Sequence, residues 1–469
     1  MNNLVEATLT KNSKTANGMT TNSTSLNKCL DLFFIAGASR TMSEENIIKM
    51  FSGAIAENSN IALKILFWAR DVRGGAGERR FFRTCMLWLS ENYPELSKKV
   101  TEHIPEFGRW DDIFYGDTDK AITSILWALG SANALCAKWM PRKGPVAEQL
   151  RKAMGMSPKE YRKTLVALTN VVESRMCKRQ WKKIGYSKVP SIAFSRYRNA
   201  FWKNDGDRFA EFLTDVKKGK QKINAGAIFP HDIIRPYLDM SHKSDDAITE
   251  QWNALPNYME GSTDNILPVC DVSGSMTGLP MEVSISLGIY ISERNEGAFK
   301  NAFITFSERP QMEYLEGDVW ERTRQLSMAD WGMSTNIEAT FDLVLDSAVR
   351  DNVPQSQMPT KLLIISDMEF NHATAIRRGW DAESDWNPTA MEMMKNKYDN
   401  AGYEMPGIVF WNVNGRMGNV PAKADTENTA LVSGFSPAIL TSVLGGELPT
   451  PLEVMFQTLN NERYECIKA

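Results

Sequence analysis

The spacing of apolar residues changes once along the chain, near residue 250. Between Cys29 and Leu238, apolar residues recur every three or four positions in short stretches, as at Ile47, Phe51 and Ile55, and Gly or Pro breaks separate the stretches. This spacing places apolar side chains on one face of a helix. Successive helix pairs of this length predict an N-terminal α-helical domain, a HEAT-like repeat solenoid or ring.

Beyond residue 263 the apolar runs have the length of strands. Helical or loop stretches separate these runs, which lie at residues 267–270, 302–306, 361–365, 407–411 and 430–432. Alternation of this kind predicts an α/β domain, in which helices cover both faces of a parallel sheet.

One segment carries a conflicting pattern. Apolar residues alternate at period two from Met281 to Ile291, which taken alone is typical of a strand. We predict a helix, because Pro280 suits a first helical turn and Ser284, Ser286 and Gly288 allow close packing on a sheet.

Two polar stretches set the predicted domain bounds. Residues 1–27 are rich in Asn, Thr, Ser and Lys, which predicts a mobile arm, and residues 243–263 predict a connector. The helical domain is therefore expected at 28–242 and the α/β domain at 264–469.

Charge divides the chain in the same way. Residues 1–250 hold 39 Lys and Arg against 27 Asp and Glu, a net charge of +12, and the rest holds 15 against 30, a net charge of −15. The most basic window, 151–200, has 13 basic and 2 acidic residues. Opposite charges predict different partners for the two domains, with a polyanion favoured for the basic one.

The composition limits the cellular locations and the kinds of cysteine site that we expect. No apolar run reaches the roughly 18 residues of a membrane span, and the first residues lack the layout of a signal peptide. The six cysteines form no Cys-x-x-Cys pair, which argues against a zinc site or a disulfide framework. We expect a cytoplasmic monomer with no membrane partner.

Candidate metal ligands follow the first predicted strand. Asp271-Val272-Ser273-Gly274-Ser275 places a carboxylate and two hydroxyls in one loop, and Thr335 and Asp367 follow later elements. In an open α/β sheet such loops reach one edge. Two carboxylates and three hydroxyls suit Mg²⁺, with Mn²⁺ or Ca²⁺ as alternatives, and leave room for an acidic ligand from a partner protein. The alternative is that these residues only form turns and helix caps.

Two basic stretches are candidates for contacts with RNA phosphates. Arg70, Arg73, Arg79 and Arg80 surround the turn Gly74-Gly75-Ala76-Gly77, whose backbone N–H groups could meet phosphate. The alternative is that these arginines form ion pairs at a helix corner.

The second stretch is denser. Its basic residues are Arg175, Lys178, Arg179, Lys182, Lys183, Lys188, Arg196, Arg198 and Lys203. Trp181, Tyr186, Tyr197 and Trp202 are interleaved with them, and cations beside aromatic faces are how single-stranded nucleic acid is held. The alternative is a solvated basic helix face whose aromatic side chains point into the core.

The C-terminal part resembles a known family. Asp271-Val272-Ser273-Gly274-Ser275, Thr335 and the post-strand Asp367 resemble the metal-ion-dependent adhesion site (MIDAS) of von Willebrand factor A domains over residues 262–469. The resemblance implies a Rossmann-like doubly wound sheet, with Asp271, Ser273 and Ser275 as direct ligands and Thr335 and Asp367 binding directly or through water. It also implies capture of a partner carboxylate rather than catalysis.

The helical part resembles the TROVE module of the Ro autoantigen, whose members also end in a von Willebrand A domain. The similar motifs are Arg70-Asp71-Val72-Arg73-Gly74-Gly75 with Gly77-Glu78-Arg79, Gly108-Arg109-Trp110-Asp111-Asp112, and Phe229-Pro230-His231. Three others resemble TROVE-like proteins of unknown function in plants and viruses: Trp331-Gly332-Met333-Ser334-Thr335, Ser366-Asp367-Met368-Glu369-Phe370 and Val409-Phe410-Trp411-Asn412. The resemblance implies binding of small noncoding or misfolded RNA, with single-stranded ends in a ring and duplexes on its outer face.

We therefore expect a non-enzymatic, Ro-like RNA-binding protein whose A domain binds metal and docks an acidic partner. The second hypothesis is a protein-interaction scaffold whose basic face is incidental. An enzyme is the third, because no Walker loop, His-Glu-x-x-His or Gly-x-Ser-x-Gly motif is present, although Asp271 with Mg²⁺ leaves a phosphotransferase open.

Overall fold

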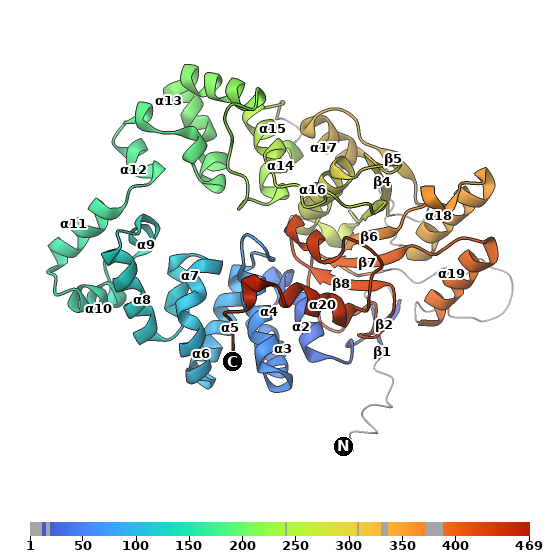
Figure 1. Ribbon diagram of the computed structural model, residues 1–469, viewed down its shortest axis with the longest axis horizontal. Coiled ribbons are helices and arrows are strands. Elements are labelled where there is room, and N and C mark those ends of the chain that lie inside the picture. Colours follow the sequence, from blue (N-terminus) through green and yellow to red (C-terminus); the bar gives the residue numbers. More distant parts are fainter. Residues whose placement is uncertain (1–11, 16–18, 240–241, 307–308, 330–335, 371–387) are drawn as a thin grey trace. The chain divides into compact units, whose positions relative to one another are not determined.

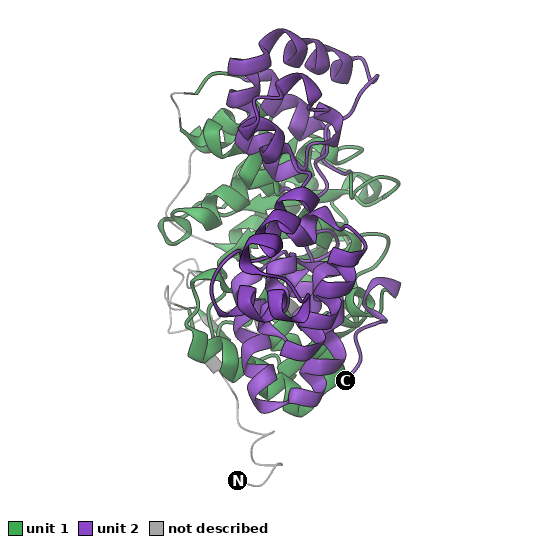
Figure 2. Cartoon of the chain, turned by 90° about the vertical axis from the view of Figure 1, so that its left-hand side faces the viewer, with its two compact units in different colours: residues 1–65, 229–244, 257–461 green, residues 66–228, 245–256, 462–469 purple. Residues whose placement is uncertain are grey.

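The computed structural model forms two compact units (Figure 2). It describes residues 12–15, 19–239, 242–306, 309–329, 336–370 and 388–469. Unit 1 comprises residues 1–65, 229–244 and 257–461, and unit 2 comprises residues 66–228, 245–256 and 462–469. The compact units thus divide the chain along other lines than the predicted bounds, because unit 1 includes the start and the end of the predicted helical domain.

A six-stranded sheet forms the centre of unit 1 (Figure 1). Its strands are β3 (Ile266–Cys270), β4 (Ala302–Thr305), β5 (Met312–Tyr314), β6 (Lys361–Ser366), β7 (Gly407–Asn412) and β8 (Thr429–Ser433). Their order is β5-β4-β3-β6-β7-β8, and all neighbours are parallel except β4 and β5. This is the Rossmann order, and the direction of winding reverses between β3 and β6.

The predicted parallel strands are confirmed, and β5 is an addition. This edge strand has three residues and its side chains are half-buried or exposed, so Met312-Glu313-Tyr314 carries no apolar run that sequence analysis could detect.

The segment with the conflicting pattern is a helix, as predicted. α16 (Leu279–Arg294) has Pro280 in its first turn, and residues 283–292 are all buried. It packs on β3, β4 and β6 and against α14 (Pro230–Leu238) and α17 (Val319–Met328), so apolar side chains are needed on nearly every side. A Cβ atom at Gly288 would lie 2.4 Å from the Cys270 Sγ atom, which shows how closely the helix approaches β3.

Helices from the predicted helical domain also pack in unit 1. α2 (Lys28–Ala36) lies on β8, where the Ser433 hydroxyl donates a 2.8 Å hydrogen bond to the Phe33 carbonyl. α3 (Glu44–Glu57) packs on α2, and α14 is joined to α16 by the Arg235–Glu282 ion pair of 2.8 Å. The other unit 1 helices are α18 (Ile337–Asp351), α19 (Pro388–Ala401) and α20 (Pro451–Leu459).

The prediction of a mobile arm is wrong for the described part of residues 1–27. β1 (Asn12–Lys14) and β2 (Thr20–Asn22) form an antiparallel hairpin. The Thr15 hydroxyl donates to the Phe370 carbonyl over 2.7 Å, and Asn22 and Val420 exchange backbone hydrogen bonds. Polar composition suggested disorder, but these polar groups are satisfied by loops of the sheet that are distant in sequence.

Unit 2 is made of helices that contact other helices nearby in sequence, as in a repeat solenoid. The helices are α4 (Ser59–Arg70), whose last turns lie in unit 2, α5 (Arg79–Asn92), α6 (Pro94–Val100), α7 (Ile104–Phe107), α8 (Thr118–Gly130), α9 (Ala134–Trp139), α10 (Pro145–Ala153), α11 (Pro158–Leu168), α12 (Val172–Cys177), α13 (Ser191–Lys217) and α15 (Asp246–Asn253). The predicted helical class is therefore confirmed.

An aromatic cluster fixes the corner between α12 and α13. Tyr186 packs edge-on against Phe201 and Phe209, with ring centroids 5.1 and 5.0 Å apart, and Phe194 and Phe212 complete the cluster. Burying each of these rings stabilises the fold by about 2–3 kcal/mol. The cluster thus gives the basic segment around it a rigid base.

Candidate nucleic-acid interface and metal centre

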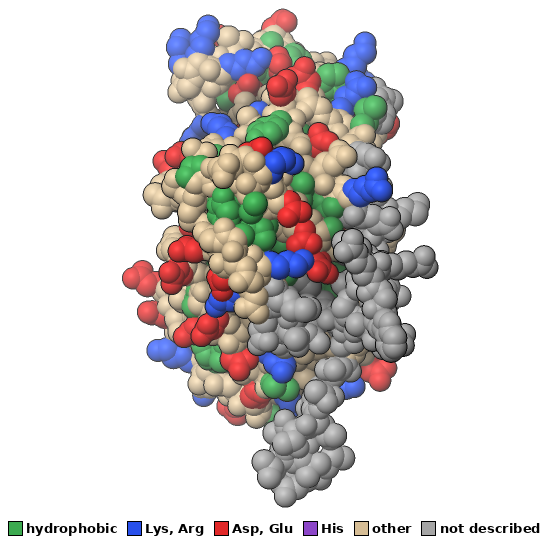
Figure 3. All heavy atoms as spheres, turned by 90° about the vertical axis from the view of Figure 1, so that its right-hand side faces the viewer, with side chains coloured by type: hydrophobic (Ala, Val, Ile, Leu, Met, Phe, Trp, Pro, Cys, Tyr) green, Lys and Arg blue, Asp and Glu red, His purple; other side chains and the backbone are tan. Residues whose placement is uncertain are grey.

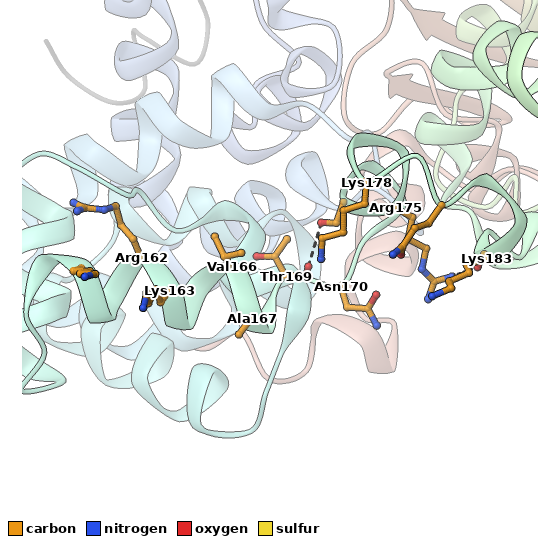
Figure 4. A pocket seen from close by; sticks show the side chains of 12 residues that line it. Arg162, Lys163, Val166, Ala167, Thr169, Asn170, Arg175, Lys178 and Lys183 are labelled. Carbon is orange, nitrogen blue, oxygen red and sulfur yellow. Dashed lines mark hydrogen bonds between the residues drawn. The ribbon is translucent and has the colours of Figure 1, made fainter.

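A basic hollow of about 750 Å³ opens along α11 and α12. We call it the basic groove, and Figure 4 shows Arg162 and Lys163 toward one end, with Arg175, Lys178 and Lys183 toward the other. The described residues that line it are Lys159, Arg162, Lys163, Val166, Ala167, Thr169, Asn170, Ser174, Arg175, Lys178, Gln180 and Lys183. Six of them are Lys or Arg and none is acidic, so the groove concentrates positive potential.

Helix geometry creates one wall of the groove. α11 starts at a capping box in which Ser157 and Glu160 bond each other's backbone N–H groups. Tyr161 and Leu165 are buried on its inner face, and the Tyr161 hydroxyl donates to the Pro141 carbonyl over 3.0 Å. The opposite face therefore presents Arg162 and Lys163 to solvent.

The other wall comes from the segment predicted to bind RNA. Arg175, Lys178 and Lys183 line the groove, and Arg175 Nη1 is held by the Lys183 carbonyl over 2.5 Å. Five more predicted residues are exposed on the surface of unit 2 outside the groove lining: Arg179, Lys182, Lys188, Arg196 and Lys203. Arg198 instead pairs with Asp245 over 3.3 Å.

Three groove cations were absent from the predicted site. Lys159, Arg162 and Lys163 lie inside the most basic window of the sequence, 151–200, which was the available signal. The sequence alone does not single them out, because the groove forms only where α11 meets residues 174–183 in the folded chain.

The interleaved aromatic residues serve mainly the core, which is the alternative reading stated above. Tyr186 is buried, and Trp181 and Tyr197 are partly buried against the aromatic cluster. Trp202 alone among the four is exposed, at 40%, and it packs edge-on against Phe209. Most of these aromatic side chains therefore pack in the core, and Trp202 keeps part of its ring exposed.

At the glycine turn, the prediction for Arg70 needs correction. Its side chain is buried, and Nε and Nη2 donate to Asp112 Oδ2 over 2.9 and 2.7 Å. Arg83 donates to Asp112 Oδ1 over 2.6 Å, and Arg109 and Arg83 share Asp111. This arginine–aspartate network joins α4, α5 and the 3₁₀ turn Trp110–Tyr115. The motif residues that belong to it therefore hold these three elements together.

The other arginines of the turn differ in exposure. Arg73 is exposed and its Nη1 donates to the Glu106 carbonyl over 2.9 Å, and Arg80 is half-buried. Arg79 is exposed at the start of α5, and burial of part of its side chain, with Arg109 and Arg83 nearby, lowers its pKa. Crowded guanidinium groups favour a bound anion, so Arg79 stays a candidate for phosphate contact.

The candidate metal residues meet at the sheet edge where the direction of winding reverses, between β3 and β6. Cys270 pairs with Ile365 across β3 and β6, so Asp271 and Asp367 both lie just beyond the carboxyl ends of adjacent strands. Asp271 accepts hydrogen bonds from the Ser366 hydroxyl (2.6 Å) and the Ser273 N–H (2.9 Å), and the Ser273 and Ser275 hydroxyls are 3.1 Å apart. Thr335, the fifth predicted ligand, lies outside the described residues.

Burial makes the charges at this edge costly. It raises the pKa of Asp271 to about 6, with hydrogen bonds from Ser366 and Ser273 acting against it, and burial also raises the pKa of Asp367. Among the described residues, Asp367 Oδ2 is buried without a hydrogen bond. Hard oxygen donors with an unsatisfied buried carboxylate oxygen fit a small divalent cation.

A guanidinium also faces this edge. Arg416 lies 3.3 Å from Asp367 Oδ2, a charge contact without hydrogen-bond geometry, and it donates to Glu369 Oε1 over 3.1 Å. Its positive charge therefore stands where it would oppose a metal cation.

The third helical motif anchors α14. His231 is buried between Phe229, which stacks on it at 5.7 Å, and Phe435 after β8, which meets it edge-on at 5.6 Å. Burial, with Arg40 and Arg235 nearby, lowers its pKa well below the ordinary value. The motif is explained by packing within unit 1.

The charge division follows the compact units. Unit 2 holds 33 Lys and Arg against 22 Asp and Glu, and unit 1 holds 21 against 35. Acidic side chains are spread over the face of the molecule in Figure 3, which looks from the side of α18 and α19 in Figure 1. No helix within the described ranges is long and apolar enough to cross a membrane.

Comparisons with known proteins place the chain in a family. Residues 265–464 match a domain of unknown function, DUF7788, and residues 15–98 and 118–263 match another, DUF2828. The Ro (RSR) protein of Deinococcus radiodurans is similar over 92% of this chain and 99% of its own, with 13% identity and a TM-score of 0.40, too weak a likeness to transfer any property. The uncharacterized protein L728 of Acanthamoeba polyphaga mimivirus is 30% identical over 95% of this chain and 86% of its own. As the sequence motifs predict, the chain belongs to a family of unknown function with a viral member, that of the mimivirus protein.

Proposed function

We propose that this protein binds RNA through unit 2 and is not an enzyme. The observation that carries the proposal is the basic groove, in which six cations from α11, α12 and the segment that follows α12 converge with no acidic residue in the described lining. Such a groove suits a phosphate backbone, because each neutralised phosphate releases condensed counterions. The ligands we propose are small noncoding or misfolded RNAs in the cytoplasm, bound through single-stranded ends and duplex segments.

Filter binding across a salt series tests the proposal. Full-length protein is titrated with a single-stranded and a hairpin RNA, and the charge-reversal variant Arg162→Glu/Lys163→Glu removes one wall of the groove. We expect the variant to bind at least about tenfold more weakly at low salt and to lower the slope of log affinity against log salt by about 1–2.

A matched pair controls for general loss of positive charge. Lys98 and Lys99 on α6 are adjacent and exposed, like the groove pair, and lie in the same unit. Lys98→Glu/Lys99→Glu should change affinity less than about threefold. Equal effects of the two variants, or no binding of either RNA by the unmodified protein at low salt, would refute the proposal.

We further propose that Asp271, Ser273, Ser275 and Asp367 hold a divalent cation, Mg²⁺ or Mn²⁺, with Thr335 supplying a fifth group. The cation would supply a Lewis-acidic position for a Glu or Asp side chain of a partner protein. Support comes from the oxygen donors gathered at the sheet edge and from the buried Asp367 Oδ2, which has the charge contact with Arg416 but no hydrogen bond.

Calorimetric titration with Mn²⁺ tests this metal site. Asp271→Asn should abolish binding, and Arg416→Gln should tighten it about fivefold, because a competing charge worth roughly 1 kcal/mol is removed. Arg350→Gln, which alters an exposed arginine paired with Asp351 on α18, is the control and should have no effect. Binding that survives Asp271→Asn, or is weakened by Arg416→Gln, would rule against the arrangement.

The second candidate function is a protein-interaction scaffold. The sheet edge that carries Asp271 and Asp367 would be sufficient for this function. Charge reversal at Lys182, Lys183, Arg196 and Arg198 separates the two functions. If these residues contact RNA, the variant should lose most of its RNA affinity. If the protein is a scaffold, RNA affinity should be unchanged by the substitutions or absent from the unmodified protein as well.

A further inference from the structure

Three possible metal ligands of three chemical types meet in unit 2. His103 ends the 3₁₀ turn Thr101–His103, Glu106 belongs to α7, and Cys466 lies in the segment 462–469. One ligand atom from each lies within 4.8 Å of the others. None of the three is buried, so an ion and a further ligand can reach them.

The surrounding contacts hold Cys466 in place. The Tyr464 hydroxyl donates to Asp71 Oδ2 over 3.1 Å, and Arg463 Nη2 donates to Asp71 Oδ1 over 2.8 Å. The Tyr464 ring stacks on Phe107 at the end of α7, with centroids 5.7 Å apart and planes 19° from parallel. Ile467 is fully buried on the other side of Cys466. The thiol is therefore fixed between two anchored residues, which lowers the entropy cost of binding an ion.

His103 and Glu106 are placed by the helix. They stand three positions apart across the turn that joins the 3₁₀ segment to α7, a spacing that brings side chains to one face. The buried Ile104 and Phe107 fix that turn from within. All three candidate ligand residues thus lie in segments that buried neighbouring residues hold in place.

We propose that His103, Glu106 and Cys466 form a zinc site. An imidazole, a thiolate and a carboxylate are zinc ligands, and the two anionic groups balance the charge of Zn²⁺. Because Mg²⁺ and Ca²⁺ favour oxygen ligands, the thiolate makes the site unsuitable for these two ions. Three protein ligands leave a fourth position for water or a partner side chain.

Spacing along the chain does not reveal this zinc site. Cys466 stands far from His103 in sequence, and only the return of segment 462–469 to unit 2 brings them together. Bound zinc would fasten that segment to α7. The site is independent of the RNA and metal proposals made above.

Cobalt spectroscopy tests the site directly. Reduced full-length protein is titrated with Co²⁺, whose bond to thiolate gives an intense charge-transfer absorption, and Zn²⁺ is then added as competitor. We expect the band to saturate near one equivalent and to disappear with zinc. Cys466→Ser should remove the band, and His103→Gln and Glu106→Gln should each weaken Co²⁺ binding by about tenfold or more.

Cys177 supplies the control, because it is the other exposed cysteine. Cys177→Ser should keep the full band, and zinc should raise the melting temperature of this variant but not of Cys466→Ser. Circular dichroism establishes that each variant is folded. The proposal fails if the unmodified protein gives no band, if the band survives Cys466→Ser, or if folded His103→Gln and Glu106→Gln variants bind Co²⁺ as tightly as the unmodified protein.

Discussion

Several residues that look functional in the sequence hold the fold together. Asp112 accepts hydrogen bonds from Arg70, Arg83 and the backbone of Arg109, and Asp71 accepts from Arg463 and Tyr464. Breaking a buried pair by removing one partner costs about 3–5 kcal/mol. A charged motif at a helix corner therefore indicates a structural network as readily as a binding site.

His231 gives a prediction at this scale. Its pKa is depressed in the folded protein, so below pH of about 6.5 the unfolded chain takes up a proton that the folded chain does not. The stability contribution is complete above that pH and is lost as pH falls, by up to about 1.4 kcal/mol per pH unit. His231→Phe should remove this loss, as measured by urea unfolding at pH 7 and pH 5.5.

The comparison must be made as a difference between variant and unmodified protein. Asp271, whose pKa burial raises to about 6, acts with the opposite sign in the same window, because its folded form takes up the proton. His242→Gln alters a half-exposed histidine and serves as the control substitution. An identical pH dependence in His231→Phe and the unmodified protein would contradict the prediction.

Helices and strands could be predicted where the apolar pattern of their own residues determined which side chains are buried. The parallel strands and α16 follow from apolar runs and from Pro280, Ser284, Ser286 and Gly288. The hairpin β1–β2 and the edge strand β5 were missed, because their partners are distant in sequence or their runs are short.

The candidate sites divide in the same way. Asp271 and Asp367 could be placed together because parallel strands end at one edge, whereas the groove wall of Lys159, Arg162 and Lys163 depends on tertiary packing. Burial of Arg70 and Tyr186 could not be read from composition, because charged and aromatic residues occur in both cores and surfaces.

Gly288 gives a prediction at the scale of elements. The added methyl group of Gly288→Ala would overlap Cys270 Sγ, so we expect a loss of about 1–3 kcal/mol in the free energy of unfolding. Gly53→Ala in α3 meets only the flexible end of Lys28 at 3.5 Å and should stabilise by up to about 1 kcal/mol. Urea unfolding measures both. If the close contact is the cause, adding Cys270→Ala to Gly288→Ala should recover part of the loss, and no recovery would contradict it.

At the scale of the whole molecule, the net charge of −3 conceals two units of opposite sign. Unit 2 has a net charge of +11 and unit 1 of −14, from the counts given above. Surface potential decays over about 10 Å at 0.1 M salt, so a polyanion near unit 2 senses that unit more than the sum.

Chromatography measures this separation of charge. At pH 7 and low salt the protein should bind both heparin and an anion exchanger, although its overall charge is negative. Arg162→Glu/Lys163→Glu should elute earlier from heparin and later from the anion exchanger. Passage of the unmodified protein through heparin at low salt would show that the positive charge is too dispersed to act.

The path of the chain between the two units has a consequence for proteolysis. The chain leaves unit 1 at residue 65, builds most of unit 2 and re-enters unit 1 at residue 229. A single cut within residues 66–228 therefore leaves two products, each of which carries part of unit 1, including α2 on one side and β8 on the other. Because α2 packs on β8, the nicked protein should stay together until a denaturant separates its halves.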